Sequence, residues 1–246
     1  ASSGTYTCNG TGVAVSINGA TANFAGATIN VGNNTDEAMR LYSGAVNVTG
    51  GTINVKNYFL ADVAGFSISG GTMNIGTGGA VTYEAFYIFG NGTFSGGTID
   101  VQSVQTGGSG IALDISSGST FTGGLMKVTA TNANYNLWTR KAYNLEINSS
   151  GRTASLPTSM SIYGNLSVTA GSLIATGGTA SFLGSIVQSI LGTSATEITL
   201  YNLTLNNSNG LTIAPSSGIA TTVKYTLTMT SGKITLGNYT LNIGAS

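Results

Sequence analysis

One short segment, in which apolar and polar residues alternate, recurs along the first half of the chain. Its copies are Gly26-Ala-Thr-Ile-Asn-Val31, Gly50-Gly-Thr-Ile-Asn-Val55, Gly70-Gly-Thr-Met-Asn-Ile75, Gly96-Gly-Thr-Ile-Asp-Val101 and Gly123-Gly-Leu-Met-Lys-Val128. In each copy the two apolar side chains are two positions apart, which is the period of a half-buried β-strand. Successive copies are 20 to 27 residues apart. A repeat of that length indicates a solenoid or a related repeat architecture.

Two further alternating stretches precede these copies. Val46 and Val48 lie just before one copy, and Phe86 and Ile88 lie earlier in the repeat of another. Three strands per repeat, joined by corners rich in glycine, therefore form one coil. The pattern predicts an all-β fold, a right-handed parallel β-helix (β-solenoid) with about three short strands per coil of 20–27 residues.

The C-terminal part repeats with a longer unit. Residues 143–148 match residues 201–206, and residues 166–171 match residues 227–232, so the unit is about 60 residues long, or two to three coils. Residues 131–142 interrupt the pattern and are aromatic rather than rich in proline or serine. We expect an N-terminal solenoid section over 1–130, a seam or loop over 131–142, and a C-terminal section over 143–246.

Composition excludes several classes of partner and chemistry. Eight basic residues balance eight acidic ones, so no large field is available to hold nucleic acid or an anionic membrane. No apolar run is long enough for a transmembrane helix, and we expect no membrane insertion. Histidine is absent, which makes a Ser/His/Asp triad impossible and a transition-metal site improbable. We expect no cofactor and no metal.

The carboxylates decide whether the chain could be a polysaccharide-degrading enzyme. Asp36 and Glu37 are adjacent, and neighbours on a strand point to opposite faces, so this pair does not form a glycosidase dyad unless a loop holds it. Asp62, Glu84 and Asp114 occupy similar positions in successive coils and are the most plausible catalytic set. Solvated turn residues are the ordinary interpretation of these acids, so we predict no catalytic residue and no enzyme. Calcium, held by carboxylates and carbonyls, stays open as an alternative.

Two sets of outward-facing side chains suggest binding surfaces. The column Thr28, Thr52, Thr72 and Thr98 would form a flat threonine ladder, for which ice binding and simple sheet stabilisation are both open. Alternation places Phe86 and Ile88 inside and leaves Tyr87 and Phe89 outside. Exposed aromatic side chains of this kind mark contact with another subunit or stack on sugar rings.

Strand-like segments lie close to both ends of the chain. Unpaired backbone at the end of a solenoid can add the next molecule, and such a contact does not close, so it grows a filament. The residues expected to make this contact are Tyr6, Cys8, Val13, Val15, Tyr239, Leu241 and Ile243. We therefore predict a self-assembling structural subunit of a fibre, a homopolymer. The alternative is a glycan-binding or adhesive module of a larger surface protein, with surface polysaccharide as its partner.

The C-terminal repeats resemble those of a known group. Residues 182–192, 201–210 and 227–237 are similar to the repeats of large secreted surface proteins and adhesins of Bacteroidota-type bacteria. The resemblance implies a β-rich protein that is secreted and extracellular or held at the cell surface, and it implies no activity. A chain that begins Ala-Ser-Ser-Gly without Met is interpreted as a mature chain whose export signal has been removed.

Overall fold

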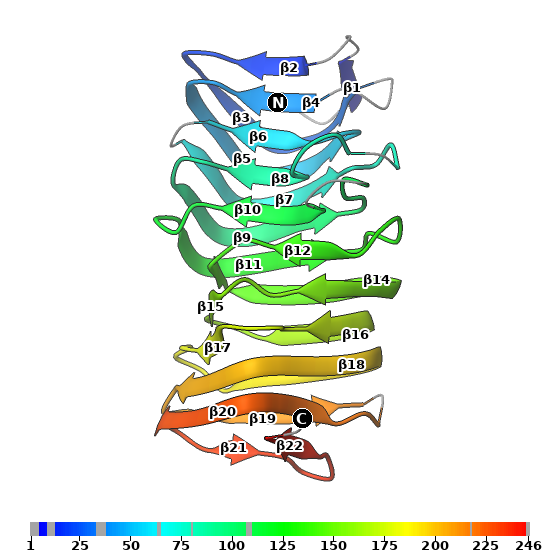
Figure 1. Cartoon of the computed structure of the whole chain (residues 1–246). Helices are drawn as coiled ribbons and strands as arrows, with labels where there is room; N and C mark the ends of the chain where they lie inside the picture. The colour runs from blue at the N-terminus through cyan, green and yellow to red at the C-terminus, as the bar shows by residue number, and fades with distance from the viewer. Residues whose placement is uncertain are drawn as a thin grey trace.

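The chain forms a stack of parallel strands that winds from one end of the molecule to the other (Figure 1). The computed structural model describes residues 5–8, 13–32, 38–62, 65–79, 81–106, 110–216 and 218–244. Within these ranges the fold is all-β, without a helix, and forms a β-solenoid of about ten coils, which confirms the predicted fold class. No helix long and apolar enough to cross a membrane occurs in the described ranges.

The strands are, in chain order, β1 (Thr5–Cys8), β2 (Val13–Ile17), β3 (Ala20–Val31), β4 (Ala38–Leu41), β5 (Gly44–Val55), β6 (Phe59–Ala61), β7 (Phe66–Ile75), β8 (Phe86–Ile88), β9 (Gly92–Val101), β10 (Ile111–Ile115), β11 (Thr120–Val128), β12 (Tyr135–Leu137), β13 (Lys141–Ala142), β14 (Asn144–Ser155), β15 (Ser159–Ile162), β16 (Leu166–Ile174), β17 (Thr179–Phe182), β18 (Gln188–Asn206), β19 (Leu211–Pro215), β20 (Thr221–Ser231), β21 (Ile234–Thr235) and β22 (Leu241–Ile243).

These strands stack in three columns, and each coil contributes one segment to each column. Column A contains β2, β4, β6, β8, β10 and β12, then the second parts of β14 and β16, the middle of β18, the start of β20, and β22. Column B contains the first parts of β3, β5, β7, β9 and β11, then β13, β15, β17 and the last parts of β18 and β20. Column C contains β1, the second parts of the long strands β3 to β11, the first parts of β14, β16 and β18, and finally β19 and β21.

Paired positions in column A are 19 to 27 residues apart, as Tyr135 opposite Ala154 and Ala61 opposite Ile88 show. Residues 131–142 contain β12 and β13, which continue columns A and B. The two segments that match at about 60 residues stand in different columns, since Leu145 pairs with Leu166 in column C and Leu203 pairs with Leu227 in column B.

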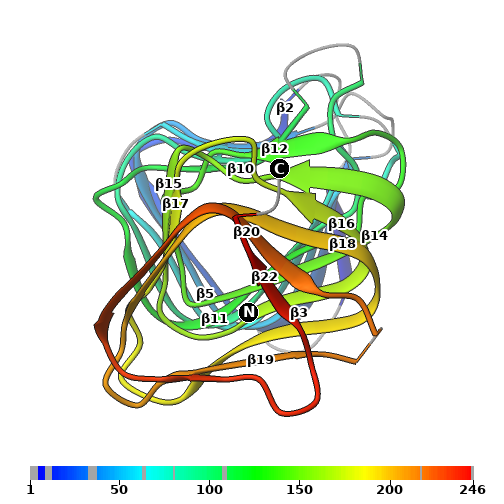
Figure 2. The ribbon, with the colours of Figure 1, turned by 60° about the horizontal axis from the view of Figure 1, so that its bottom comes forward.

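The core lies inside the stack of coils, which Figure 2 shows almost end on. Each repeated segment places its two apolar side chains inward, as Ile53 and Val55 are fully buried in β5. Residues of the same kind in successive coils then stack on one another along the axis. Phe59 and Phe86 pack with ring centroids 5.3 Å apart, and Phe94 and Phe121 with centroids 4.6 Å apart. Coil-to-coil stacking of aromatic and branched side chains is the main apolar contribution to stability.

Candidate functional site

The outward side of column A carries charged and aromatic side chains that fall into two rows. Buried residues alternate with outward residues along these short strands, as in β8, where Phe86 and Ile88 are buried. Row one contains Arg40, Leu60, Tyr87, Asp114 and Trp138. Row two, two residues further along each coil, contains Tyr42, Asp62, Phe89, Ser116 and Arg140. Together these residues are called the column A face.

Backbone hydrogen bonds fix the register of the rows. The amide of Asp62 donates to the carbonyl of Leu41 at 2.9 Å, and that of Phe89 donates to Ala61 at 2.9 Å. The same bond from Ser116 continues the second row. Neighbouring strands lie about 4.8 Å apart, so each row presents one side chain per coil at that spacing.

A register shift in β10 brings Trp138 into row one. Leu137 pairs with Leu113, and the amide of Trp138 donates to the carbonyl of Leu113 at 2.7 Å. Trp138 therefore stands in the coil next to Asp114, and Arg140 follows in row two. The Trp138 side chain is 52% exposed.

Within the face, side chains two residues apart contact each other. The Arg40 guanidinium lies 4.4 Å from the centroid of the Tyr42 ring. Tyr87 and Phe89 meet edge to face with centroids 6.3 Å apart. In the direction of the axis, Arg40 donates to Asp62 Oδ2 from Nη2 at 2.9 Å and from Nε at 3.1 Å. These contacts hold the long side chains in one arrangement.

Asp114 stands between two aromatic residues of row one. Burial raises the pKa of its carboxyl from 3.8 to about 6, and the nearby charge of Glu84 adds to the rise. Burial also raises the pKa of Tyr87, with further contributions from Asp114, Glu84 and Asp62. The three acids that the sequence grouped therefore surround one tyrosine on this face.

A cleft of about 660 Å³ opens beside Asp114, on the side of the later coils. Its lining comprises Asp114, Ile115, Ser116, Ser117, Trp138, Arg140, Leu156, Pro157 and Thr158. A carboxylate, a guanidinium, several hydroxyls and an indole ring thus line one cleft, beside Leu156 and Pro157. Such a set can hydrogen-bond hydroxyl groups while the ring covers an apolar surface.

The structure places the sequence-predicted surface residues on this face. Phe89 is 67% exposed and Tyr87 is half-buried. The sequence places Trp138 and Arg140 in a seam and does not connect them with Phe89. Among the described residues no group of three or more possible ligands could hold a metal ion. Asp36 and Glu37 lie outside the described residues.

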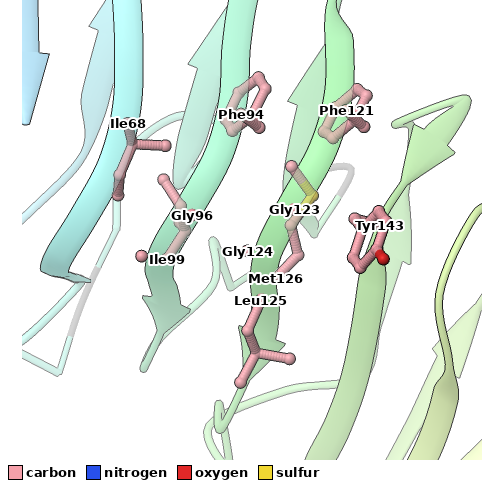
Figure 3. Close-up of a pocket in the computed structure, with 11 residues that line it drawn as sticks. Ile68, Phe94, Gly96, Ile99, Phe121, Gly123, Gly124, Leu125, Met126 and Tyr143 are labelled. Carbon is pink, nitrogen blue, oxygen red and sulfur yellow. The ribbon is translucent and has the colours of Figure 1, made fainter.

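The other surfaces offer less chemistry. The threonine column is in register, and beside it Asn54 donates to Asn30 at 2.8 Å and Asn74 donates to Asn54 at 2.7 Å. These amides bind one another and brace the sheet. A hollow of about 10 Å³ lies at the glycine corners between columns B and C, beside Phe94 of β9, Phe121 of β11 and Tyr143, which precedes β14 (Figure 3). That volume is close to the minimum for one water molecule.

The expected assembly residues lie in the outermost described strands. Tyr6 and Cys8 belong to β1, which pairs with β3, and Val13 and Val15 belong to β2, which pairs with β4. At the other end, Leu241 and Ile243 belong to β22, which pairs with β20. Tyr239 precedes β22, and its amide donates to Leu236. Assembly through these strands stays a prediction.

Comparison with protein-family models, with curated proteins and with solved structures gives no match. Fold and face together define a parallel β-solenoid that carries one charged and aromatic surface along its axis. The function is therefore inferred from the side chains of that surface.

Proposed function

We propose that the chain binds a polysaccharide along the column A face. The observation that carries this proposal is the order of side chains along the axis. Aromatic residues occupy every second coil, first Tyr42, then Tyr87 with Phe89, then Trp138. The coils between them carry the carboxylates Asp62 and Asp114.

This alternation fits the surface of a sugar chain. Each pyranose ring has an apolar face, formed by its C–H groups, and a rim of hydroxyls. An exposed aromatic ring covers the apolar face of the sugar. Carboxylates and guanidinium groups form hydrogen bonds with its hydroxyls. Phe89 is 67% exposed and Trp138 is 52% exposed, and exposed apolar side chains that gather on one face mark a contact surface.

The strands hold these groups ready for binding. Backbone pairing fixes the rows, and the contacts of Arg40 with Tyr42 and with Asp62 fix side chains as well. A surface ordered before binding loses little conformational entropy when the ligand arrives, which favours affinity. Such a role agrees with the secreted, extracellular or cell-surface location that the sequence resemblance implies.

The test is binding to a panel of insoluble and soluble polysaccharides, measured by co-sedimentation and by affinity gel electrophoresis. We expect Phe89→Ala and Trp138→Ala each to weaken binding by about tenfold, because each removes one stacking platform worth about 1.4 kcal/mol. Tyr225→Ala is the matched control, since Tyr225 is 71% exposed but lies on β20, several coils beyond Trp138, where its ring stacks on that of Tyr201.

Equal losses in all three variants would show that the face is not the site. A protein that binds no member of the panel would contradict the proposal itself.

A further inference from the structure

We infer that the column A face takes an extended, straight, β-1,4-linked chain of neutral sugars lying along the solenoid axis. This inference rests on the proposed function and names the class of polysaccharide. It follows from the spacing of the aromatic coils, from the straightness of the rows, and from the charges beside them.

The spacing of the aromatic residues along the axis matches that of the sugar rings in such a chain. Adjacent coils lie about 4.8 Å apart, so aromatic residues in every second coil repeat at about 10 Å. In an extended β-1,4-linked chain of pyranoses each ring is turned by about half a turn from the one before, so every second ring presents the same face. Each ring advances such a chain by close to one coil spacing. Rings that lie over Tyr42, Phe89 and Trp138 would then alternate with rings that lie over Asp62 and Asp114.

The straightness of the rows excludes strongly curved polymers. The strands of column A from β2 to β12 lie one below another along the stack (Figure 1). An α-1,4-linked or β-1,3-linked glucan winds into a helix, and its rings leave a straight row after a few residues. Only a chain that extends in a straight line reaches from Tyr42 in row two, over the pair Tyr87 and Phe89, to Trp138 in row one with one ring on each coil.

Basic side chains are not in excess on this face. Arg40 and Asp62 neutralise each other at 2.9 Å, and Arg140 stands in the coil that follows Asp114. Glu84 lies close to Asp114, so the acidic groups here outnumber the basic ones. The face therefore does not attract a polyanion, and it favours neutral sugars over uronic acid or sulfated chains. The carboxylates instead accept hydrogen bonds from hydroxyl or amide groups at the rim of the rings.

The length of the face sets the length of the ligand. From the coil of Tyr42 to the coil of Trp138 there are four strand spacings, about 19 Å. One ring per coil then fills the face with about five sugars. Beyond Trp138 the cleft of about 660 Å³ leaves room for the chain to continue past Pro157.

The experiment compares oligosaccharides of equal length by isothermal titration calorimetry with the full chain. Cellohexaose, mannohexaose and N-acetylchitohexaose are neutral and carry the β-1,4 linkage with different ring substituents, and maltohexaose carries the glucose units of cellohexaose in α-1,4 linkage. We expect at least one β-1,4-linked hexaose to bind about tenfold or more tightly than maltohexaose. Its affinity should rise from the trisaccharide to the pentasaccharide and change little beyond.

Variants locate the ligand on the face. Trp138→Ala should lower affinity for the pentasaccharide and hexasaccharide much more than for the trisaccharide, because a short chain can bind over the remaining platforms. Tyr225→Ala should leave all affinities unchanged.

Two results would overturn the inference in distinguishable ways. If maltohexaose binds as well as the β-1,4-linked hexaoses, or if only a curved or charged polysaccharide from the panel binds, the linkage and charge class are wrong while polysaccharide binding stands. If no polysaccharide binds, both the inference and the proposed function fail.

Discussion

At the scale of single residues, Asp114 is the acid of the column A face whose environment differs most from water. It lies in the strand next to that of Tyr87 and opens onto the cleft with Trp138 and Arg140. The folded state raises the pKa of its carboxyl from 3.8 to about 6, so ionised Asp114 opposes folding. The carboxylate is retained at a cost in stability, which is typical of functional sites.

Asp114→Asn should stabilise the fold in a pH-dependent way. Between pH 4 and pH 6 the folded state binds the proton more tightly than the unfolded state, so the wild-type protein loses stability as pH rises through this window. The gain from the substitution should be absent below about pH 4 and complete above about pH 7. Because the group is partly solvated, we expect about 1 kcal/mol rather than the full value of the shift. Urea unfolding of both proteins from pH 4 to pH 8 measures it, and a gain that does not change with pH would contradict the explanation.

The outward positions of Tyr87 and Phe89 followed from the sequence, because strict alternation assigns a face to every side chain in a strand. Trp138 and Arg140 did not, for a physical reason. Their coil lacks the glycine and threonine motif, and the extra residue in β10 shifts the register between Ile111 and Leu113. That shift determines which residues of adjacent coils are neighbours. The alternation of apolar and polar residues along the chain does not reveal it.

At the scale of elements, the corner between columns B and C depends on a glycine that no other residue replaces easily. Gly71 has φ of 75°, a conformation that costs other residues about 1–2 kcal/mol. A Cβ atom there would lie 2.7 Å from the carbonyl oxygen of Gly51 and 2.7 Å from the carbonyl carbon of Gly50. The corner thus brings the backbones of adjacent coils closer than a side chain allows.

Gly71→Ala should lower the free energy of unfolding by about 2–4 kcal/mol, through the strained φ and the clash with the previous coil. Gly26→Ala is the control, because a Cβ atom at Gly26 meets nothing within 4 Å and its φ is not in the left-handed region. We expect the control to change stability by no more than about 0.5 kcal/mol. Thermal and urea unfolding of both variants measure the difference, and similar losses would mean that the corner geometry is not the cause.

The strands of columns B and C could be predicted because each repeated segment alternates as a strand does and also supplies the apolar side chains of the core. Ile53 pairs with Met73 and Val55 pairs with Ile75, so the motif repeated in the first half of the chain builds a continuous core there. The strands of column A are as short as Phe59–Ala61 and Phe86–Ile88, and the loops before them vary in length. Three residues are too few for a period to be measured, so the bounds of these strands could not be predicted from the sequence.

At the scale of the whole molecule, the coils stack into one core with an axial direction. In the described chain β22 pairs with β20 alone, and β21 pairs with β19 alone. Ile243 in β22 is 55% exposed. A strand with one free edge can pair with a strand of another molecule. This geometry is compatible with the fibre that the sequence predicts, in which the partner is a second copy of the chain.

Assembly of this kind should depend on concentration and on the apolar side chains of β22. Ile243→Lys should reduce it, because a lysine on an edge strand opposes pairing with another edge through its charge and its solvation. Val187→Lys is the matched control, since Val187 is 56% exposed but lies between β17 and β18. Sedimentation velocity and negative-stain electron microscopy at several concentrations measure the effect, and a wild-type chain that is monodisperse at every concentration would contradict self-assembly.

Assembly and binding are coupled by geometry if both occur. The rows of the column A face run parallel to the axis along which the coils stack, so molecules added end to end would present this face repeatedly along one fibre. Several faces on one fibre engaging one long polysaccharide would raise the overall avidity well above the affinity of a single face. Ile243→Lys should then weaken binding to a long polymer but leave the affinity for a hexasaccharide unchanged. Trp138→Ala should weaken both, and this contrast separates a role in assembly from a role in recognition.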